Sequence, residues 1–134
     1  MDRLRVALIA GGMSGEREVS LKSGDAVEKA LDRKKYEVKR YDPREDLGAL
    51  LRNSGNIDLA LILLHGRYGE DGSMQGLLDL LGIPYVGSGI LGSAVALNKR
   101  IAKGIFRSAG LLVADDVLLC RGEAFTADQI LERL

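Results

Sequence analysis

The fold is decided by one stretch near the amino terminus, Val6-Ala7-Leu8-Ile9-Ala10-Gly11-Gly12-Met13-Ser14-Gly15-Glu16-Arg17-Glu18-Val19-Ser20. An apolar run of strand length breaks into two glycines and continues as a charged segment with helical spacing, carried by Val19, Ser23, Val27, Ala30 and Leu31. This order predicts a first strand, a tight turn and a first helix, the opening of a parallel α/β domain. Ligands bind such domains at the carboxyl ends of the strands, so this turn is the first candidate site.

The chemistry of this turn argues against a phosphate. A glycine-rich turn that enters a helix usually suggests a phosphate held by backbone N–H groups. The spacing Gly-Gly-x-x-Gly matches neither the dinucleotide fingerprint nor the nucleoside-triphosphate loop. Glu16, with Glu18 two residues on, places negative charge at the positive end of the helix, where it would repel a pyrophosphate. The turn suits a cation such as the ammonium group of a small substrate, unless both acids are ordinary first-turn residues.

Length and composition narrow the class of protein. A chain of 134 residues is expected to form one domain with a real core. Its 19 basic and 19 acidic residues are interleaved, which argues against a nucleic-acid or anionic-membrane surface. The single cysteine, Cys120, cannot form an internal disulfide and is expected to be a buried small hydrophobe. The chain shows no signal sequence or membrane-spanning run, so we expect a cytoplasmic protein.

Further elements follow from the same kind of pattern. Strands are expected at residues 36–41, ended by Asp42-Pro43 near a sheet edge, at 57–64 as a central strand covered on both faces, and at 83–86. Helices are expected at residues 47–52, 74–81, after Gly89 to Val95, 98–107 and from 127 onward. Asn98 and Thr126 are expected N-caps, and Gly110 a helix stop. The apolar run at 113–120 predicts a last strand.

Three strands end in glycine-rich loops, at residues 11–16, 65–73 and 87–89. Because parallel strands have their carboxyl ends at one edge of the sheet, these loops should gather there and form a site. His65 ends the most apolar strand and is therefore a candidate site residue. Asp42 falls where a ribose-binding acid would sit, which keeps a nucleotide-binding alternative open, although an acid before proline is more often a turn residue.

Four blocks of sequence carry a family resemblance. They are Gly11-Gly12-Met13-Ser14-Gly15-Glu16-Arg17-Glu18-Val19-Ser20-Leu21-Lys22-Ser23-Gly24, Leu64-His65-Gly66-Arg67-Tyr68-Gly69-Glu70-Asp71-Gly72-Ser73-Met74-Gln75-Gly76, Gly82-Ile83-Pro84-Tyr85-Val86-Gly87-Ser88-Gly89 and Asn98-Lys99. In this order and spacing they resemble the amino-terminal part of D-alanine-D-alanine ligase. The resemblance covers nearly the whole chain and is weakest after Gly110.

The resemblance implies a fold and an activity. The fold is a small Rossmann-like, three-layer α/β domain, the pre-ATP-grasp domain, with a parallel sheet and helices on both faces. In the family, central and carboxyl-terminal ATP-grasp domains follow it. The family's reaction phosphorylates the carboxylate of one D-alanine with ATP. The amine of a second D-alanine then attacks the acyl phosphate and expels inorganic phosphate, which supplies a peptidoglycan precursor. The chain alone is expected to fold and not to catalyse.

The resemblance also implies roles for individual residues. Glu16 would hold the ammonium of the first D-alanine, Val19 would line that pocket, and His65 would stabilise the carboxylate as it is activated. Lys99 would reach the nucleotide phosphates. ATP and Mg²⁺ or Mn²⁺ are implied for the full-length enzyme, with no metal ligand in this chain, and a homodimer is a further implication.

Two departures from the family pattern stand out. Asn98-Lys99 replaces Asp-Lys, and Gly110-Leu111-Leu112 replaces Gly-Leu-Pro, which should loosen the entry to the last strand. The competing hypothesis is a stand-alone module that binds a nucleotide or an amino acid through the same turn. The second substrate, D-alanine, D-lactate or D-serine, is not determined by these residues.

Overall fold

The computed structural model describes residues 3–122 and 124–132 of the chain. By its internal contacts the chain divides into two compact units, Met1–Leu97 and Asn98–Leu134.

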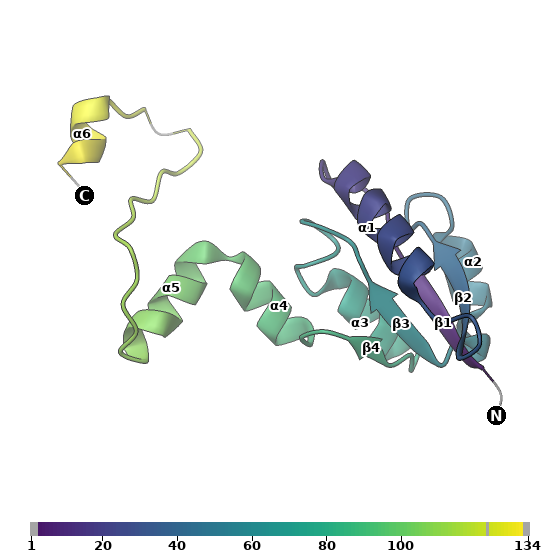
Figure 1. Ribbon diagram of the computed structural model, residues 1–134. Coiled ribbons are helices and arrows are strands. Elements are labelled where there is room, and N and C mark those ends of the chain that lie inside the picture. The colour runs from purple at the N-terminus through teal and green to yellow at the C-terminus, as the bar shows by residue number, and fades with distance from the viewer. Residues whose placement is uncertain (1–2, 123, 133–134) are drawn as a thin grey trace. The chain divides into compact units, whose positions relative to one another are not determined.

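The first unit is built on a parallel sheet (Figure 1). In the described residues its strand order is β2-β1-β3-β4, with β1 at Leu4–Ile9, β2 at Tyr36–Tyr41, β3 at Leu59–Ile62 and β4 at Tyr85–Val86. All three strand pairs are parallel, and β1 pairs with β2 along its whole length, from Leu4 beside Tyr36 to Ile9 beside Tyr41. The predicted edge position of β2 and the central position of β3 are confirmed.

Helices cover both faces of this sheet. The helix α1, Arg17–Ala30, lies over one face, and α2, Leu47–Arg52, and α3, Ser73–Leu80, lie over the other (Figure 1). A short 3₁₀ helix, Ser54–Asn56, precedes β3, and α4, Ile90–Leu97, contacts α3. The three-layer α/β fold is therefore confirmed.

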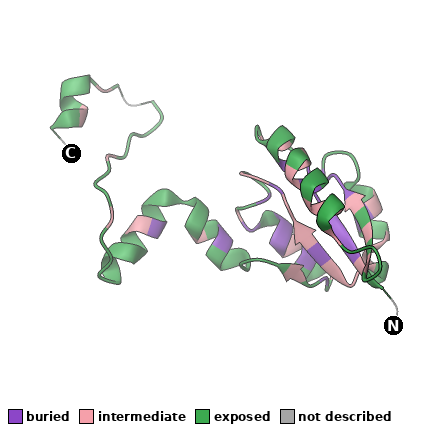
Figure 2. Ribbon diagram, viewed as in Figure 1, coloured by how far each residue is buried: buried purple, intermediate pink, exposed green. Residues whose placement is uncertain are grey.

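The core is centred on β1 (Figure 2). Its residues Ala7, Leu8 and Ile9 are fully buried, and Leu50 of α2 and Leu78 of α3 are buried as completely. In β3 only Ala60 is fully buried, while its other three residues keep part of their surface. The strand with the most apolar sequence is thus central in the sheet but less deeply covered than β1.

The helix α1 packs against the sheet through small residues. Its buried positions are Ser20 and Gly24, whereas Val19 and Ala30, which carried the apolar spacing, are exposed. The apolar spacing therefore located this face only in part: Ser23, Val27 and Leu31 are half-buried, but the buried contacts are Ser20 and Gly24, which count as polar or neutral in an apolar pattern. A Cβ atom at Gly24 would lie 2.8 Å from the Cβ of Ala10, so α1 rests almost directly on β1.

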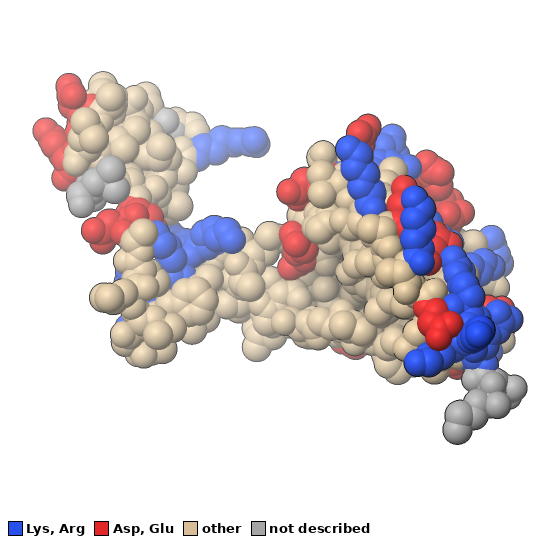
Figure 3. Space-filling model, in the orientation of Figure 1, with Lys and Arg blue, Asp and Glu red and all other residues tan. Residues whose placement is uncertain are grey.

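Acidic and basic side chains are interspersed over α1 and its surroundings (Figure 3). Arg40 of β2 pairs with Asp25 of α1, and Arg33 pairs with Glu28. At the opposite, amino-terminal edge of the sheet, hydrogen bonds from the Arg5 guanidinium and backbone lower the pKa of Asp58 to about 2. The Asp58 carboxylate, whose pKa is lowered, holds the start of β1 to the start of β3. It lies at the opposite edge of the sheet from the carboxyl ends of the strands.

The second unit contains α5, Lys99–Ser108, and α6, Ala127–Leu131. The Asn98 side chain accepts the Ile101 N–H, Thr126 forms a capping box with Gln129, and Gly110 has a positive φ of 76° just past α5. These two caps and this helix stop are confirmed as predicted.

The predicted last strand is not present. Residues 111–120 form neither helix nor strand, and Asp116 in this segment pairs with Lys103 and Arg107 of α5 at 2.9 and 2.7 Å. Cys120 is exposed, so its expected burial was wrong as well. Apolar content alone suggested a strand, but a strand needs a neighbouring strand to pair with, and this segment forms ion pairs with α5 instead.

Within the described residues, no helix is long and apolar enough to cross a membrane.

The tight packing at Gly24 can be tested by adding one methyl group. Gly24→Ala should destabilise the first unit by about 1–3 kcal/mol, because the new Cβ overlaps Ala10 and must push α1 off the sheet. Gly76→Ala in α3 is the matched control, since its Cβ would meet Ile90 at an ordinary 3.6 Å. That change should stabilise by roughly 0.5–1 kcal/mol through helix propensity. Urea unfolding of both variants measures the difference, and equal effects would contradict the packing described here.

Candidate functional site

Two of the glycine-rich loops meet directly at the carboxyl edge of the sheet. The Ser14 hydroxyl, in the loop after β1, donates to the carbonyl oxygen of His65 after β3 at 2.7 Å and accepts the Glu16 N–H at 3.1 Å. The third loop borders the second of these, because Gly87 and Ser88 line the same open hollow of about 340 Å³ as His65. The predicted gathering of the three loops is confirmed.

The backbone N–H groups of the first turn are used inside the domain. The Gly11 N–H donates to the Ser20 hydroxyl at 2.8 Å, and that hydroxyl donates to the Leu63 carbonyl at 2.6 Å. The Gly12 N–H donates to the Asp42 carboxylate at 2.8 Å. A phosphate-binding loop needs such groups directed at the ligand. These two are already satisfied, so this turn does not have the geometry of a phosphate cradle.

Asp42 is a structural carboxylate. It is only 8% exposed and accepts hydrogen bonds from the backbone N–H groups of Gly12 and Arg44 and from the Arg17 guanidinium. Burial by itself would raise the pKa of Asp42, but these hydrogen bonds and the charge of Arg17 outweigh it and hold the pKa below its ordinary value. Its oxygens are engaged, so Asp42 acts as the turn residue and not as a free ribose-binding acid.

Glu16 differs from Asp42 in its surroundings. It is the N-cap residue of α1, just outside the first turn in which it was expected, and its side chain is exposed. In the described part of the chain, its carboxylate forms no hydrogen bond or ion pair. It lies against the loop after β3, because a Cβ atom at Gly66 would stand 2.5 Å from its Oε2 atom. The site thus holds an unpaired carboxylate that lies against Gly66, the residue that follows His65 in the chain.

The imidazole of His65 lies between α1 and its own loop. Its Nε2 atom is 3.4 Å from the Ser23 hydroxyl, which itself donates to the Val19 carbonyl, and its Nδ1 atom is 3.8 Å from Glu70. The other carboxylate oxygen of Glu70 accepts the Gly66 N–H at 2.8 Å. His65 and Glu16 are therefore held at the same corner of the sheet edge.

The loop at residues 65–73 is closed by its own side chains. Asp71 accepts the N–H groups of Tyr68 and Ser73, and these bonds outweigh its partial burial and lower the pKa of its carboxyl. They hold Tyr68 at a positive φ of 68°. The acids of this loop are thus loop caps. Across residues 3–122 and 124–132, no three His, Cys, Asp or Glu side chains come together as a metal site.

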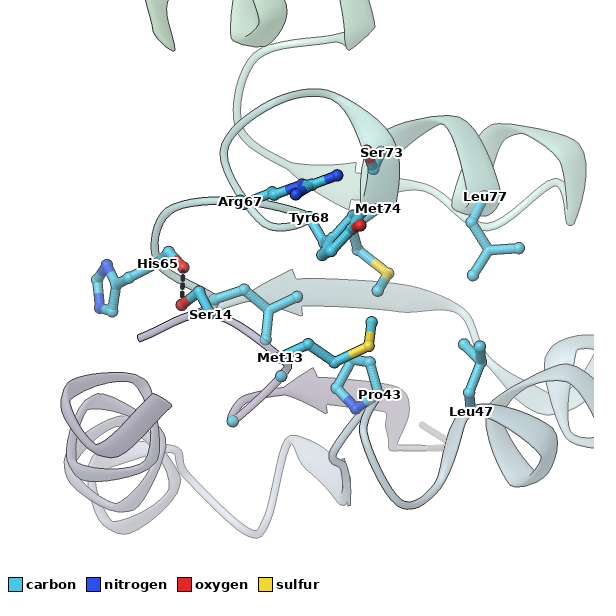
Figure 4. A pocket seen from close by; sticks show the side chains of 13 residues that line it. Met13, Ser14, Pro43, Leu47, His65, Arg67, Tyr68, Ser73, Met74 and Leu77 are labelled. Carbon is cyan, nitrogen blue, oxygen red and sulfur yellow. Dashed lines mark hydrogen bonds between the residues drawn. The ribbon is translucent and has the colours of Figure 1, made fainter. Parts of the chain in front are cut away.

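An apolar cavity of about 150 Å³ lies on the α2 and α3 side of the same loops (Figure 4). Its apolar walls are Met13, Pro43, Leu47, Leu64, Met74 and Leu77. Neither Glu16 nor Val19 lines it, and the His65 ring points away from it. Apolar walls do not suit a zwitterionic amino acid, so the cavity is distinct from the corner that holds Glu16.

The two other predicted site residues lie in different places. Val19 is 56% exposed, on the first turn of α1. Lys99 is the first residue of α5 and belongs to the second unit. The roles expected for Val19 and Lys99 stay predictions. Ser14, Ser20 and Arg17 also contribute to the site, and nothing in their local pattern marked them out, because their partners lie far along the chain.

The fold is that of a parallel α/β domain, a class in which ligands bind at the carboxyl ends of the strands, and the cluster of Glu16 and His65 lies at that edge. Comparison with known proteins agrees with the resemblance seen in the sequence. A family model described as the D-ala D-ala ligase N-terminus matches residues 43–88. The D-alanine-D-alanine ligases of Desulfotalea psychrophila and Syntrophobacter fumaroxidans are each 55% identical to this chain over 133 residues. The chain is therefore similar, over 99% of its length, to the amino-terminal part of these ligases.

Solved structures give the same relationship. The ATP complex of the D-alanine-D-alanine ligase from Bacillus anthracis matches 96% of this chain with a TM-score of 0.82 and 39% identity. The D-alanine-D-alanine ligase from Coxiella burnetii matches 99% of the chain with a TM-score of 0.82 and 26% identity. This chain covers 41% and 43% of the two sequence relatives and 44% and 49% of the two structures, so it spans less than half of each.

The hydrogen bonds to Asp42 make a prediction about stability. Asp42→Asn should lower the free energy of unfolding by about 2 kcal/mol at pH 7, because an amide NH₂ must face the donors of Gly12 or Arg17. Glu45→Gln is the control, because Glu45 pairs with the same arginine but its side chain is 67% exposed. That variant should change stability by less than ~0.5 kcal/mol.

The same carboxylate sets a pH dependence. The pKa of Asp42 is lower in the folded chain than its ordinary value of 3.8, so its contribution is present above about pH 4 and is lost as the pH falls through the lowered pKa. Unfolding curves of wild type and Asp42→Asn should therefore converge in acid. A constant difference between them down to the lowest pH measured would contradict this assignment.

Proposed function

We propose that this chain is the amino-terminal, substrate-binding part of an ATP-dependent D-alanine-D-alanine ligase. The observation that carries the proposal is the unpaired carboxylate of Glu16 at a turn whose Gly11 and Gly12 N–H groups are already satisfied. The negative charge of Glu16 attracts a cation, and the engaged N–H groups of Gly11 and Gly12 are not available to an anion. The ammonium group of an amino-acid substrate is such a cation. The similarity to curated ligases over 99% of the chain supports the same substrate class.

In this proposal each residue has a separate task. The Glu16 carboxylate binds the ammonium of the first D-alanine, and exposed Val19, one turn along α1, forms a wall of the pocket. His65 lies beside the carboxylate of the first D-alanine and donates a hydrogen bond to it. This carboxylate receives the phosphoryl group from ATP. The amine of the second D-alanine then attacks the carbonyl carbon and inorganic phosphate leaves. The work of these residues is positioning and charge neutralisation.

Other parts of the proposal concern the whole enzyme. The related Bacillus anthracis ligase was solved with ATP, and we propose that ATP and Mg²⁺ or Mn²⁺ serve the enzyme to which this chain corresponds. In the described residues no three His, Cys, Asp or Glu side chains come together, and the proposal places the metal ligands in the part of the relatives that this chain does not span. A cytoplasmic location, a homodimer and a role in peptidoglycan precursor synthesis belong to the same proposal. Exposed Leu80 and Leu91 offer apolar surface to such a dimer.

The alternative of a stand-alone nucleotide-binding module is disfavoured by the same observation, since Gly11, Gly12 and Asp42 are engaged with one another and with α1. A stand-alone amino-acid-binding module differs from a ligase part only in activity. We therefore test the proposal in a chimera, in which this chain replaces the corresponding part of the Desulfotalea psychrophila ligase. The chain alone is the negative control and should form no dipeptide.

Glu16→Gln in the chimera should raise the KM for the first D-alanine by about thirtyfold or more. Loss of one partner from a hydrogen-bonded charge pair typically costs roughly 2–5 kcal/mol, and glutamine keeps the size of the side chain. The KM for ATP should barely change. Glu18→Gln is the matched control, because Glu18 is exposed two residues on and so faces another direction on the helix. Equal, small effects from the two substitutions would return Glu16 to an ordinary helix-start acid.

Lys99→Ala in the chimera should raise the KM for ATP about tenfold or more, and the KM for D-alanine much less. The reason is that a lysine at a helix start acts as a point charge for phosphate, and such charged hydrogen bonds are worth about 1.5–3 kcal/mol. Arg100→Ala, its exposed neighbour, is the control. Unchanged kcat and KM for ATP in Lys99→Ala would show that Lys99 only faces solvent.

A further inference from the structure

The Ser14 hydroxyl is the direct link between the two loops that carry Glu16 and His65. It donates to the His65 carbonyl oxygen at 2.7 Å, the bond drawn in Figure 4, and accepts the Glu16 N–H at 3.1 Å. A hydroxyl can do both at once, because it is a donor and an acceptor. One side chain therefore joins the backbone of both proposed substrate-contacting residues.

The other side-chain tie at the start of α1 runs to a different strand, because the Arg17 guanidinium donates to Asp42 after β2 and not to the loop after β3. Glu16, its N-cap, makes no side-chain capping bond, and the Arg17 N–H reaches only the Ser14 carbonyl at 3.3 Å. The further links from α1 to the end of β3 start later in the helix, where buried Ser20 donates to the Leu63 carbonyl and the Ser23 hydroxyl lies 3.4 Å from the Nε2 atom of His65. Ser14 thus holds the outer part of the turn, where the Glu16 side chain begins.

The spacing at this corner leaves little tolerance. A Cβ atom at Gly66 would lie 2.5 Å from Glu16 Oε2 and 3.6 Å from the Ser14 Cβ, so the carboxylate and the serine lie against the same piece of backbone. A shift of the helix start relative to that backbone changes the distance between the Glu16 carboxylate and His65. Binding groups must be held to well within an ångström to work together.

We infer that Ser14 is a positioning residue, whose hydroxyl fixes the Glu16 carboxylate and His65 at the spacing needed for the ammonium and carboxylate of one amino acid. This inference rests on the proposed function for its substrate. It assigns to Ser14 no contact with the substrate itself. Its effect should therefore pass through Glu16.

The first test uses this chain alone. Ser14→Ala should speed amide hydrogen exchange at Glu16 and shift the ¹³C resonance of the His65 carbonyl, because both bonds are lost. Ser14→Thr keeps the hydroxyl and should restore both values. Ser108→Ala is the control, since the Ser108 hydroxyl donates to the Gly104 carbonyl within α5 and lies outside the first unit. Unchanged exchange and carbonyl shift in Ser14→Ala would overturn the inference.

The second test uses the chimera and separates this inference from the proposed function. Ser14→Ala should raise the KM for the first D-alanine about tenfold and leave the KM for ATP unchanged, and Ser14→Thr should recover most of the loss. Combined with Glu16→Gln, it should add little, because coupled residues are not additive. If Glu16→Gln raises the KM for D-alanine and Ser14→Ala does not, the positioning role of Ser14 is contradicted and the proposed function stands. The same holds if the effects of the two substitutions multiply in the double variant. If Glu16→Gln has no effect, the proposed function fails, and the role of Ser14 fails with it.

Discussion

The site depends on where the first turn directs its backbone N–H groups. Gly11 donates to the Ser20 hydroxyl and Gly12 to the Asp42 carboxylate, so both groups are satisfied inside the domain. A phosphate loop attracts anions in part because the backbone N–H groups of its glycine-rich turn point at the ligand. With these two occupied, the exposed Glu16 carboxylate is the main charge of the turn. A turn that resembles a phosphate cradle in sequence is thus better suited to a cation.

The same contacts fasten three strands together at the edge where the ligand is proposed to bind. Ser20 connects α1 to the ends of β1 and β3, and Asp42 connects the end of β2 to the turn after β1. Gly24 permits this arrangement, because its missing side chain lets α1 approach Ala10 closely. The helix start that carries Glu16 therefore rests on the rigid part of the fold, as binding groups that must hold a fixed spacing require.

The local sequence pattern was sufficient to predict the succession of strands and helices along the chain as far as α5, the helix caps and the meeting of the loops. It was also sufficient to single out Glu16 and His65. It failed where a residue's role depends on a distant partner. Ser14 and Ser20 act through residues 51 and 43 positions away in the chain, whereas the turn role favoured for Asp42 from the proline after it is the one the structure shows. Residues 111–120 were expected to contain a strand on apolar content, but Asp116 binds α5, and Cys120 is exposed.

In the proposed function, the turn after β1 binds a cation and not a phosphate. Chemical-shift titration of this chain with D-alanine and, separately, with NAD measures that preference most directly. We expect D-alanine to shift the backbone resonances of Glu16 and His65, these shifts to weaken as salt is added, and NAD to leave the turn unchanged. Shifts at Gly11 and Gly12 with NAD, and none at Glu16 with D-alanine, would contradict it.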